Sequence, residues 1–135
     1  MAAPTPTPRA PAGVLRGAFR TEDPEDAHER TERLMTGHRM TVDRDGAPFR
    51  ADVRWVGGAG LGLLRFSYGA EVEIHSHPLD DFATVHLPAR GGFRAEHRGM
   101  RVRAGPACGA VFSSSGPLTM RWDAGLELLV LKIAR

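Results

Sequence analysis

Two histidines and an aspartate lie close enough together in the sequence to suggest a metal site. His75 and His77 are separated by one residue, and Asp81 follows four residues later. Side chains two apart on a β-strand point to the same face, so both imidazoles could converge on one ion. Two histidines and one carboxylate can hold iron or manganese and leave positions open for substrate and oxygen. This arrangement would be typical of a metal-dependent enzyme.

The residues around the histidine pair favour a surface position instead. Counted by twos, the histidines share a face with two glutamates, whereas Val72 and Ile74 point the other way. If Val72 and Ile74 face the core, His75 and His77 face solvent. Pro78 follows at once and should end the strand. We therefore predict an exposed histidine pair, no bound metal and no catalytic residue.

Four other residues are candidates for lining a small-molecule pocket. Such pockets have mostly apolar and aromatic walls with a few polar groups that orient the ligand. The candidates lie on apolar strand faces: Trp55, Arg65, His86 and Trp122. Arg65 has an equally good alternative, in which it points outward while Leu64 and Phe66 point inward, because an unpaired buried arginine is costly.

We do not expect the remaining histidines or the single cysteine to bind a ligand. His28 lies in a predicted helix and His38 just after it, and both should be solvated. His97 alternates with residues on an apolar face, which favours a hydrogen-bonded core histidine over a ligand. Cys108 is the only cysteine. It cannot form a disulfide within the chain, and the simplest interpretation is a small core residue.

Length and charge restrict the class of protein. A chain of 135 residues has room for one domain with a real core. The formal charge is only +2, and the arginines alternate with apolar residues along predicted strands, which argues against a nucleic-acid surface. No apolar run is long enough to span a membrane, and the N-terminus does not read as a secretory signal. We therefore expect a cytoplasmic protein without membrane association.

The N-terminal part of the chain predicts a disordered segment followed by one helix. Residues 1–13 are rich in proline, alanine and threonine and should be disordered. The folded domain is expected to cover residues 14–135. Its only convincing helix is predicted over residues 24–36, with Asp23 as the N-cap and Gly37 ending it in a left-handed conformation.

Beyond Phe49 the apolar residues recur with a period of two, which indicates β-strands. About nine short strands follow, with glycine or proline between neighbours. Residues 82–87 form one of them, which Pro88 should close. Residues 126–134 are apolar on both faces at their centre and should lie in the middle of a sheet. The fold class is therefore mainly β, a jelly-roll barrel of about nine strands preceded by one helix.

Several short stretches also occur in a characteristic order. They are FRTED at 19–23, FRA at 49–51, LLRFSYGA at 63–70, DDF at 80–82, LP at 87–88, GPA at 105–107, GPLTMRW at 116–122 and the strand at 126–135. Together they resemble the N-terminal ligand-binding domain of AraC-type transcription regulators, a cupin-like barrel preceded by a helix. The resemblance covers nearly the whole chain from Phe19 and rests on order and spacing more than on any one motif.

The resemblance implies a non-catalytic regulatory domain that senses a small molecule or mediates dimerisation. In that family a C-terminal module with two helix-turn-helix units binds DNA. Nothing follows Arg135 in this sequence, and no paired helices precede the barrel, so this chain alone should not bind nucleic acid. We expect a small-molecule effector and a second copy of the chain as partners, and no cofactor.

Two alternatives stay open. Gly69, His75, His77 and Asp81 resemble the first metal motif of cupin enzymes, with Asp81 where a glutamate is usual, which would make the chain a dioxygenase or isomerase. The second cupin motif supplies a further histidine, and the corresponding residues 111–115 contain none. The other alternative is an interaction module that pairs with a full-length regulator.

Overall fold

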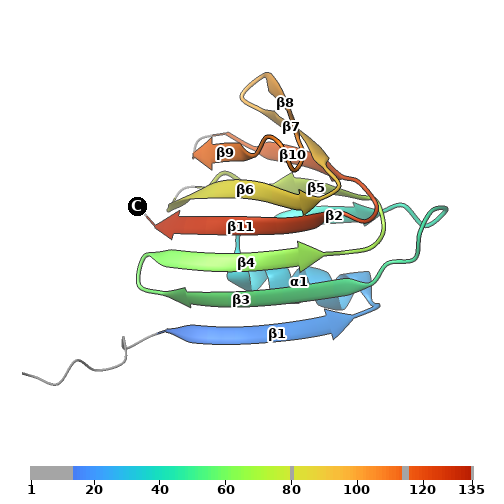
Figure 1. The fold of residues 1–135 in the computed structure, drawn as a ribbon, viewed down its shortest axis with the longest axis horizontal. Helices are drawn as coiled ribbons and strands as arrows, with labels where there is room; N and C mark the ends of the chain where they lie inside the picture. The colour runs from blue at the N-terminus through green and yellow to red at the C-terminus, as the bar shows by residue number, and fades with distance from the viewer. Residues whose placement is uncertain (1–13, 80, 114–115, 135) are drawn as a thin grey trace, which may run out of the picture.

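Two antiparallel β-sheets pack face to face in the computed structural model, which describes residues 14–79, 81–113 and 116–134 (Figure 1). The first sheet has six strands, in the order β1 (Leu15–Thr21), β3 (Ala51–Gly58), β4 (Leu61–Ser67), β11 (Glu127–Ala134), β6 (Phe82–Arg90) and β9 (Ala110–Ser113). The second has five strands, in the order β2 (His38–Val42), β5 (Val72–Ser76), β10 (Leu118–Trp122), β7 (Phe93–His97) and β8 (Met100–Ala104). The expected mainly β, cupin-like fold is confirmed.

The described part of the chain contains one helix, α1 (Pro24–Leu34), which begins where the sequence predicts and ends earlier. The Asp23 carboxylate accepts a hydrogen bond from the Glu25 N–H at 3.0 Å, as expected of an N-cap. The prediction that the helix reaches residue 36 is wrong, because Met35 already leaves the helical region, with φ −119° and ψ −99°. Gly37 does not adopt the left-handed conformation, since the chain runs directly into β2.

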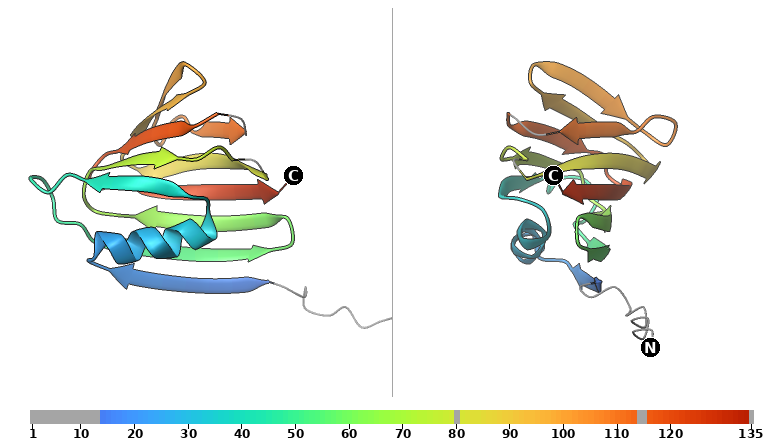
Figure 2. Two further views of the ribbon diagram at one scale, coloured as in Figure 1. Left: turned by 180° about the vertical axis from the view of Figure 1, so that it is seen from behind. Right: turned by 90° about the vertical axis from the view of Figure 1, so that its left-hand side faces the viewer.

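Helix α1 covers the part of the first sheet that the second sheet leaves open. In Figure 2 it lies beside β2, in the layer opposite β3 and β4. Its buried residues are Ala27 and Thr31. The Thr31 hydroxyl and the Tyr68 hydroxyl form a hydrogen bond of 3.0 Å, which ties the helix to the end of β4. The helix therefore acts as one wall of the interior.

The described residues form eleven strands, so the expected number of about nine was too low. The two extra strands, β1 and β2, are edge strands, whose weaker burial leaves less apolar alternation in the sequence. The prediction that Pro88 closes its strand is also wrong, because β6 continues to Arg90. Pro88 lies next to a register shift in the pairing of β6 with β11. On its other side β6 pairs with β9 only through residues 83–86. The N–H that proline lacks is therefore not needed for a hydrogen bond to β9.

The core lies between the sheets and follows the predicted alternation. Strand β11 is central, between β4 and β6, as its apolar character predicted. The largest fully buried side chains include Val53, Phe93, Phe112 and Leu128. The interpretation of Cys108 as a core residue is wrong: it is exposed, in a tight turn that hydrogen-bonds it to Gly105.

Within the described ranges, no helix is long and apolar enough to cross a membrane. The segment 1–13, for which disorder is expected, lies outside the described residues.

Candidate functional site

A small cavity lies between the two sheets, beneath the C-terminal end of α1. Its volume is about 50 Å³. The side chains around it are mostly apolar, and none of them is an aspartate, glutamate, lysine or arginine. They are Thr31, Met35, Thr36, His38, Phe66, Tyr68, Ile74, Ser76, Leu79, Thr84, His86, Leu118, Met120, Trp122 and Val130.

Three buried polar atoms in the wall of this cavity make no hydrogen bond among the described residues. They are Oγ1 of Thr84, Nδ1 of His86 and Nε1 of Trp122. All three side chains are at most 5% exposed. A buried polar group without a partner costs about 1–3 kcal/mol, and most such groups in proteins are paired. Three of them around one cavity therefore indicate a place where a bound molecule can form hydrogen bonds.

Strand geometry explains why these groups meet. Thr84 and His86 are two residues apart on β6, so both point inward. Trp122 lies at the end of β10, in the opposite sheet. Its ring packs against Phe66 and Tyr68, with ring centroids 5.7 Å and 5.2 Å apart. These aromatic contacts hold the indole N–H in a fixed orientation.

The His86 ring is held by aromatic neighbours in a similar way. It packs edge-on against Phe112 and Phe93, with centroid distances of 5.0 Å and 5.7 Å. Burial lowers the pKa of His86 to about 4, so the imidazole is neutral near pH 7. A neutral imidazole has one nitrogen that donates and one that accepts a hydrogen bond.

The Tyr68 hydroxyl completes the uncharged character of the cavity wall. Burial raises the pKa of Tyr68 to about 12, against the opposing effect of its hydrogen bond with Thr31. The phenol therefore stays protonated at neutral pH. Together with His86 it gives a cavity whose described side chains can exchange hydrogen bonds with a ligand but offer no charge to an ionic one.

The structure brings together two of the four residues predicted to bind a ligand. His86 and Trp122 both line the cavity. Trp55 instead lies beside a separate hollow of about 280 Å³, near Leu34. Arg65 is exposed on the outer face of β4, 3.8 Å from the Glu127 carboxylate, which is the alternative position considered for it. Ligand binding by any of these four residues is still a prediction.

The histidine pair of the sequence motif lies on the outside of the second sheet, as expected. Val72 and Ile74 are buried, and His75 and His77 are exposed. His75 Nε2 lies 3.1 Å from a carboxylate oxygen of its neighbour Glu73. Asp81 is exposed as well. These side chains do not point into the cavity between the sheets.

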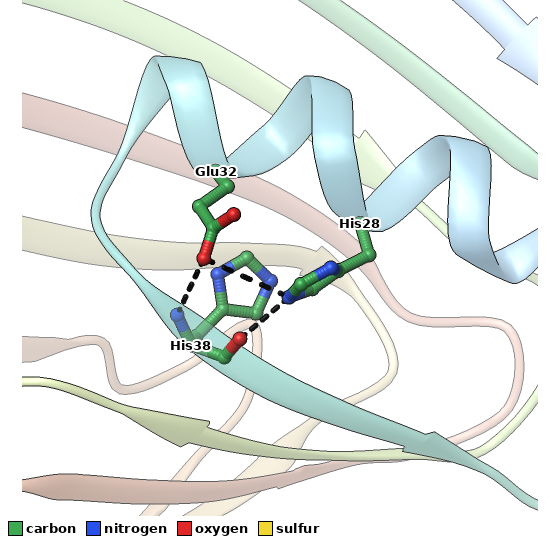
Figure 3. A group of neighbouring side chains, drawn as sticks. All are labelled: His28, Glu32 and His38. Atoms are coloured by element: carbon green, nitrogen blue, oxygen red, sulfur yellow. Dashed lines mark hydrogen bonds and ion pairs between the residues drawn. The ribbon is translucent and has the colours of Figure 1, made fainter.

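A second group of potential ligands was not predicted from the sequence. His28, Glu32 and His38 each place one donor atom within 4.8 Å of those of the other two (Figure 3). The expectation that His38 is solvated is wrong: it is 8% exposed, because β2 starts beneath α1. The sequence contains one local signal for this group, since residues 28 and 32 are four apart and share a helix face.

Comparisons with known proteins agree with this architecture. Residues 27–135 match the family described as AraC-binding-like domain. The AraC-like transcriptional activator CuxR has a similar structure, with a TM-score of 0.63 and 15% identity over 89% of this chain. This chain spans 47% of the length of CuxR.

KdgF from Halomonas sp. shares the fold, with a TM-score of 0.54 and 15% identity over 72% of this chain and 86% of its own. No curated protein sequence matches this chain significantly. The match over residues 27–135 covers most of the sequence, and the fold agrees with it. The chain belongs to the AraC-binding-like domain family.

Proposed function

We propose that this domain is a non-catalytic sensor that binds a small uncharged molecule in the cavity between its sheets. The observation that carries the proposal is a group of three buried polar atoms around one cavity, on Thr84, His86 and Trp122, which have no hydrogen-bond partner among the described residues. A protein with no use for these atoms could replace them with apolar ones and gain stability. Binding sites often contain groups that lower the stability of the protein in this way.

The cavity wall favours a particular class of ligand. The described residues that line it include no aspartate, glutamate, lysine or arginine, and transfer of an unpaired charge into such a site is strongly unfavourable. The ligand is therefore neutral and compact, with an acceptor for the indole N–H of Trp122. The volume of about 50 Å³ is well below that of a drug-sized pocket, about 300–1,000 Å³. Met35 and Met120 line the cavity and can change rotamer to enlarge it.

Membership of the AraC-binding-like family supports a regulatory role for this binding. The similar structure of CuxR, an AraC-like transcriptional activator, points in the same direction. In this proposal the domain supplies the ligand-dependent step of transcription control. DNA contacts are not assigned to the described residues: four of the exposed arginines, at positions 54, 94, 101 and 103, lie on β3, β7 and β8 and so are divided between the two sheets.

Replacing Thr84 by valine tests the cavity directly. Valine keeps the shape of threonine and removes the unpaired hydroxyl, so the free energy of unfolding should rise by about 1 kcal/mol. Benzyl alcohol, a neutral probe, should stabilise the wild type in thermal unfolding and bind the variant several-fold more weakly, by about one lost hydrogen bond. Isothermal titration calorimetry measures that affinity difference.

Two controls accompany this experiment. Benzoate has nearly the same shape as benzyl alcohol but is charged, and it should not stabilise the wild type. Thr119→Val removes a hydroxyl that lies on the outer face of β10, near His75, and should leave probe binding unchanged. The proposal would be contradicted if benzoate bound the wild type as tightly as benzyl alcohol does. It would also be contradicted if Thr84→Val were less stable than the wild type and bound benzyl alcohol equally well.

A second function, self-association, is favoured by the outer face of the first sheet. A row of apolar residues crosses five neighbouring strands in register, from β3 to β9: Val56, Leu63, Leu131, Val85 and Val111. Val111 is 68% exposed and Val56 is 38% exposed. Contiguous apolar surface of this kind usually marks an interface. We infer that a second copy of the chain covers it, since a two-fold axis through the row would place the same apolar side chains of two copies against each other.

Sedimentation equilibrium tests this inference. The wild type should sediment as a dimer at micromolar concentration, and Leu131→Arg, which places a charge in the middle of the row, should be monomeric. Thr119→Arg, on the outer face of the other sheet, is the matched control and should remain dimeric. A monomeric wild type, or dissociation by the control substitution alone, would contradict dimerisation through this face.

The alternative of a metal-dependent dioxygenase or isomerase receives less support. Its candidate ligands His75, His77 and Asp81 are exposed, and none of them lines the cavity where a substrate could be enclosed. The histidine pair also sits beside glutamates on the open surface of β5. Catalysis at such a position would lack the exclusion of water that enclosed sites provide.

A further inference from the structure

Three side chains from α1 and β2 converge at the edge of the cavity. His28 and Glu32 lie on one face of α1, four residues apart, and His38 begins β2 directly beneath them (Figure 3). One donor atom from each residue lies within 4.8 Å of the other two. The distance from His28 Nε2 to the nearer Glu32 oxygen is 3.9 Å. The group combines two imidazoles and one carboxylate.

The His38 ring is already oriented as a metal ligand would be. Its Nδ1–H donates a hydrogen bond to the Thr36 carbonyl oxygen at 2.9 Å, which leaves the lone pair on Nε2. Metal-bound histidines commonly donate their other ring nitrogen to a carbonyl oxygen in this way. Burial lowers the pKa of His38, so the ring is neutral near pH 7. Figure 3 shows the ring turned toward the His28 imidazole.

The other two side chains leave the group accessible from outside. The His28 side chain is 29% exposed and that of Glu32 is 43% exposed. An ion can therefore reach the group from solvent and keep at least one water molecule. Two histidines, one glutamate and a water molecule form a common tetrahedral set for zinc.

We propose that His28, Glu32 and His38 bind one divalent transition-metal ion of the zinc type. Zinc ligands lie about 2.0–2.2 Å from the ion, so His28 Nε2 and the Glu32 carboxylate must come slightly closer together than their separation of 3.9 Å. His28 Nε2 gives up its contact with the His38 carbonyl oxygen, and its proton moves to Nδ1. The ion then links α1 to β2.

This site differs from the histidine motif recognised in the sequence. His75 and His77 belong to β5 and its end, and neither is among the three converging ligands. The proposed metal site shares only His38 with the cavity, since His28 and Glu32 are not among the residues that line it. Metal binding can therefore be confirmed or excluded whatever the outcome of the probe experiments with Thr84→Val.

Titration with zinc chloride tests the proposal, after the purified protein has been treated with EDTA and dialysed. The wild type should bind one Zn²⁺ per chain and unfold at a higher temperature with the ion than without it. Glu32→Gln and His28→Gln remove one ligand each and should weaken the affinity at least about tenfold. Both positions are partly exposed, so the variants should fold normally without metal.

His75→Gln is the matched control and should bind Zn²⁺ as the wild type does. His77 is not used as a control, because its ring lies over Gly37, near Glu32. Bound Co²⁺ should give visible absorption bands in the wild type that disappear in Glu32→Gln. An absence of stoichiometric binding, or binding that is lost in His75→Gln and kept in Glu32→Gln, would overturn the proposal.

Discussion

Lowering the pH from about 6.5 to 4 is expected to destabilise the wild type by about 3 kcal/mol more than the His86→Leu variant. Burial lowers the pKa of His86 to about 4 in the folded protein, whereas an unfolded histidine titrates near 6.5. Between these values the unfolded chain binds a proton that the folded protein does not. The free energy of unfolding therefore rises with pH between about 4 and 6.5, and above this range the contribution of His86 to stability is fully present.

Urea unfolding at several pH values measures this difference. Leucine replaces the imidazole with an apolar side chain, so the variant loses the proton linkage of this position. The pKa of His38 is also lowered by burial, and this histidine remains in both proteins, so the difference between them isolates His86. His75→Gln removes an exposed histidine without changing the core and serves as the control. Parallel pH profiles for wild type and His86→Leu would show that residue 86 does not stay neutral inside the cavity.

The same property that makes the protein sensitive to acid keeps the cavity suited to neutral ligands. A protonated His86 would introduce a charge among Phe93 and Phe112, whose rings enclose it. None of the described residues that line the cavity is an aspartate or glutamate that could compensate that charge. We therefore expect probe binding in the cavity to decline over the same pH range in which stability is lost.

Alternation of apolar residues was sufficient to predict the strands that carry the cavity. Strand β11 (Glu127–Ala134) almost coincides with the predicted strand 126–134, and it is central as its two apolar faces indicated. His86 and Trp122 are buried in the wall for the same reason, since each shares a face with core residues. A period of two is a strong signal when one face of a strand is fully buried.

The predictions failed where a position depends on contacts between distant segments. His38 looks solvated in the sequence because it follows a helix, and it is buried only because β2 turns back beneath α1. Cys108 is apolar enough for a core, yet the tight turn with Gly105 holds it outside. Arg65 could be placed on either face by periodicity, and the pairing of β4 with β11 decides in favour of the outer one.

The ends of elements were also decided by tertiary structure. Pro88 was expected to stop β6, but the neighbouring strand β9 is short, so the missing N–H does not interrupt a ladder there. Lys132 interacts with the end of α1: its ammonium donates a hydrogen bond to the Leu34 carbonyl oxygen at 2.8 Å and lies 4.5 Å from the centre of the Phe82 ring. A cation at this position compensates the last carbonyl groups of the helix, which no local pattern in the sequence indicates.

The Trp122→Ala variant is expected to be about 3–5 kcal/mol less stable than the wild type. Trp122 is 5% exposed, and its indole lines the cavity beside the rings of Phe66 and Tyr68, against which it packs. Truncation removes these contacts and joins the indole-sized space to the existing cavity. Added indole should occupy that space and restore stability, by about 1.4 kcal/mol at ten times its dissociation constant. Thermal unfolding with and without indole measures both effects.

Phe93→Ala provides the comparison for this experiment. Phe93 is buried to a similar extent but does not line the cavity, so the variant should lose comparable stability while its smaller space should not accept indole. Indole-3-carboxylate, which adds a charge to the same ring, should fail to rescue Trp122→Ala. Rescue of both variants by indole would contradict a specific site at residue 122.

The choice of rescuing molecule also tests whether the indole N–H of Trp122 lacks an acceptor. Nε1 has no hydrogen-bond partner among the described residues. Indene has the shape of indole but no N–H, so it avoids placing an unpaired donor in this position. It should therefore stabilise Trp122→Ala at least as well as indole does. A clear preference for indole would mean that the cavity supplies an acceptor of its own, and the ligand would then not need to provide one.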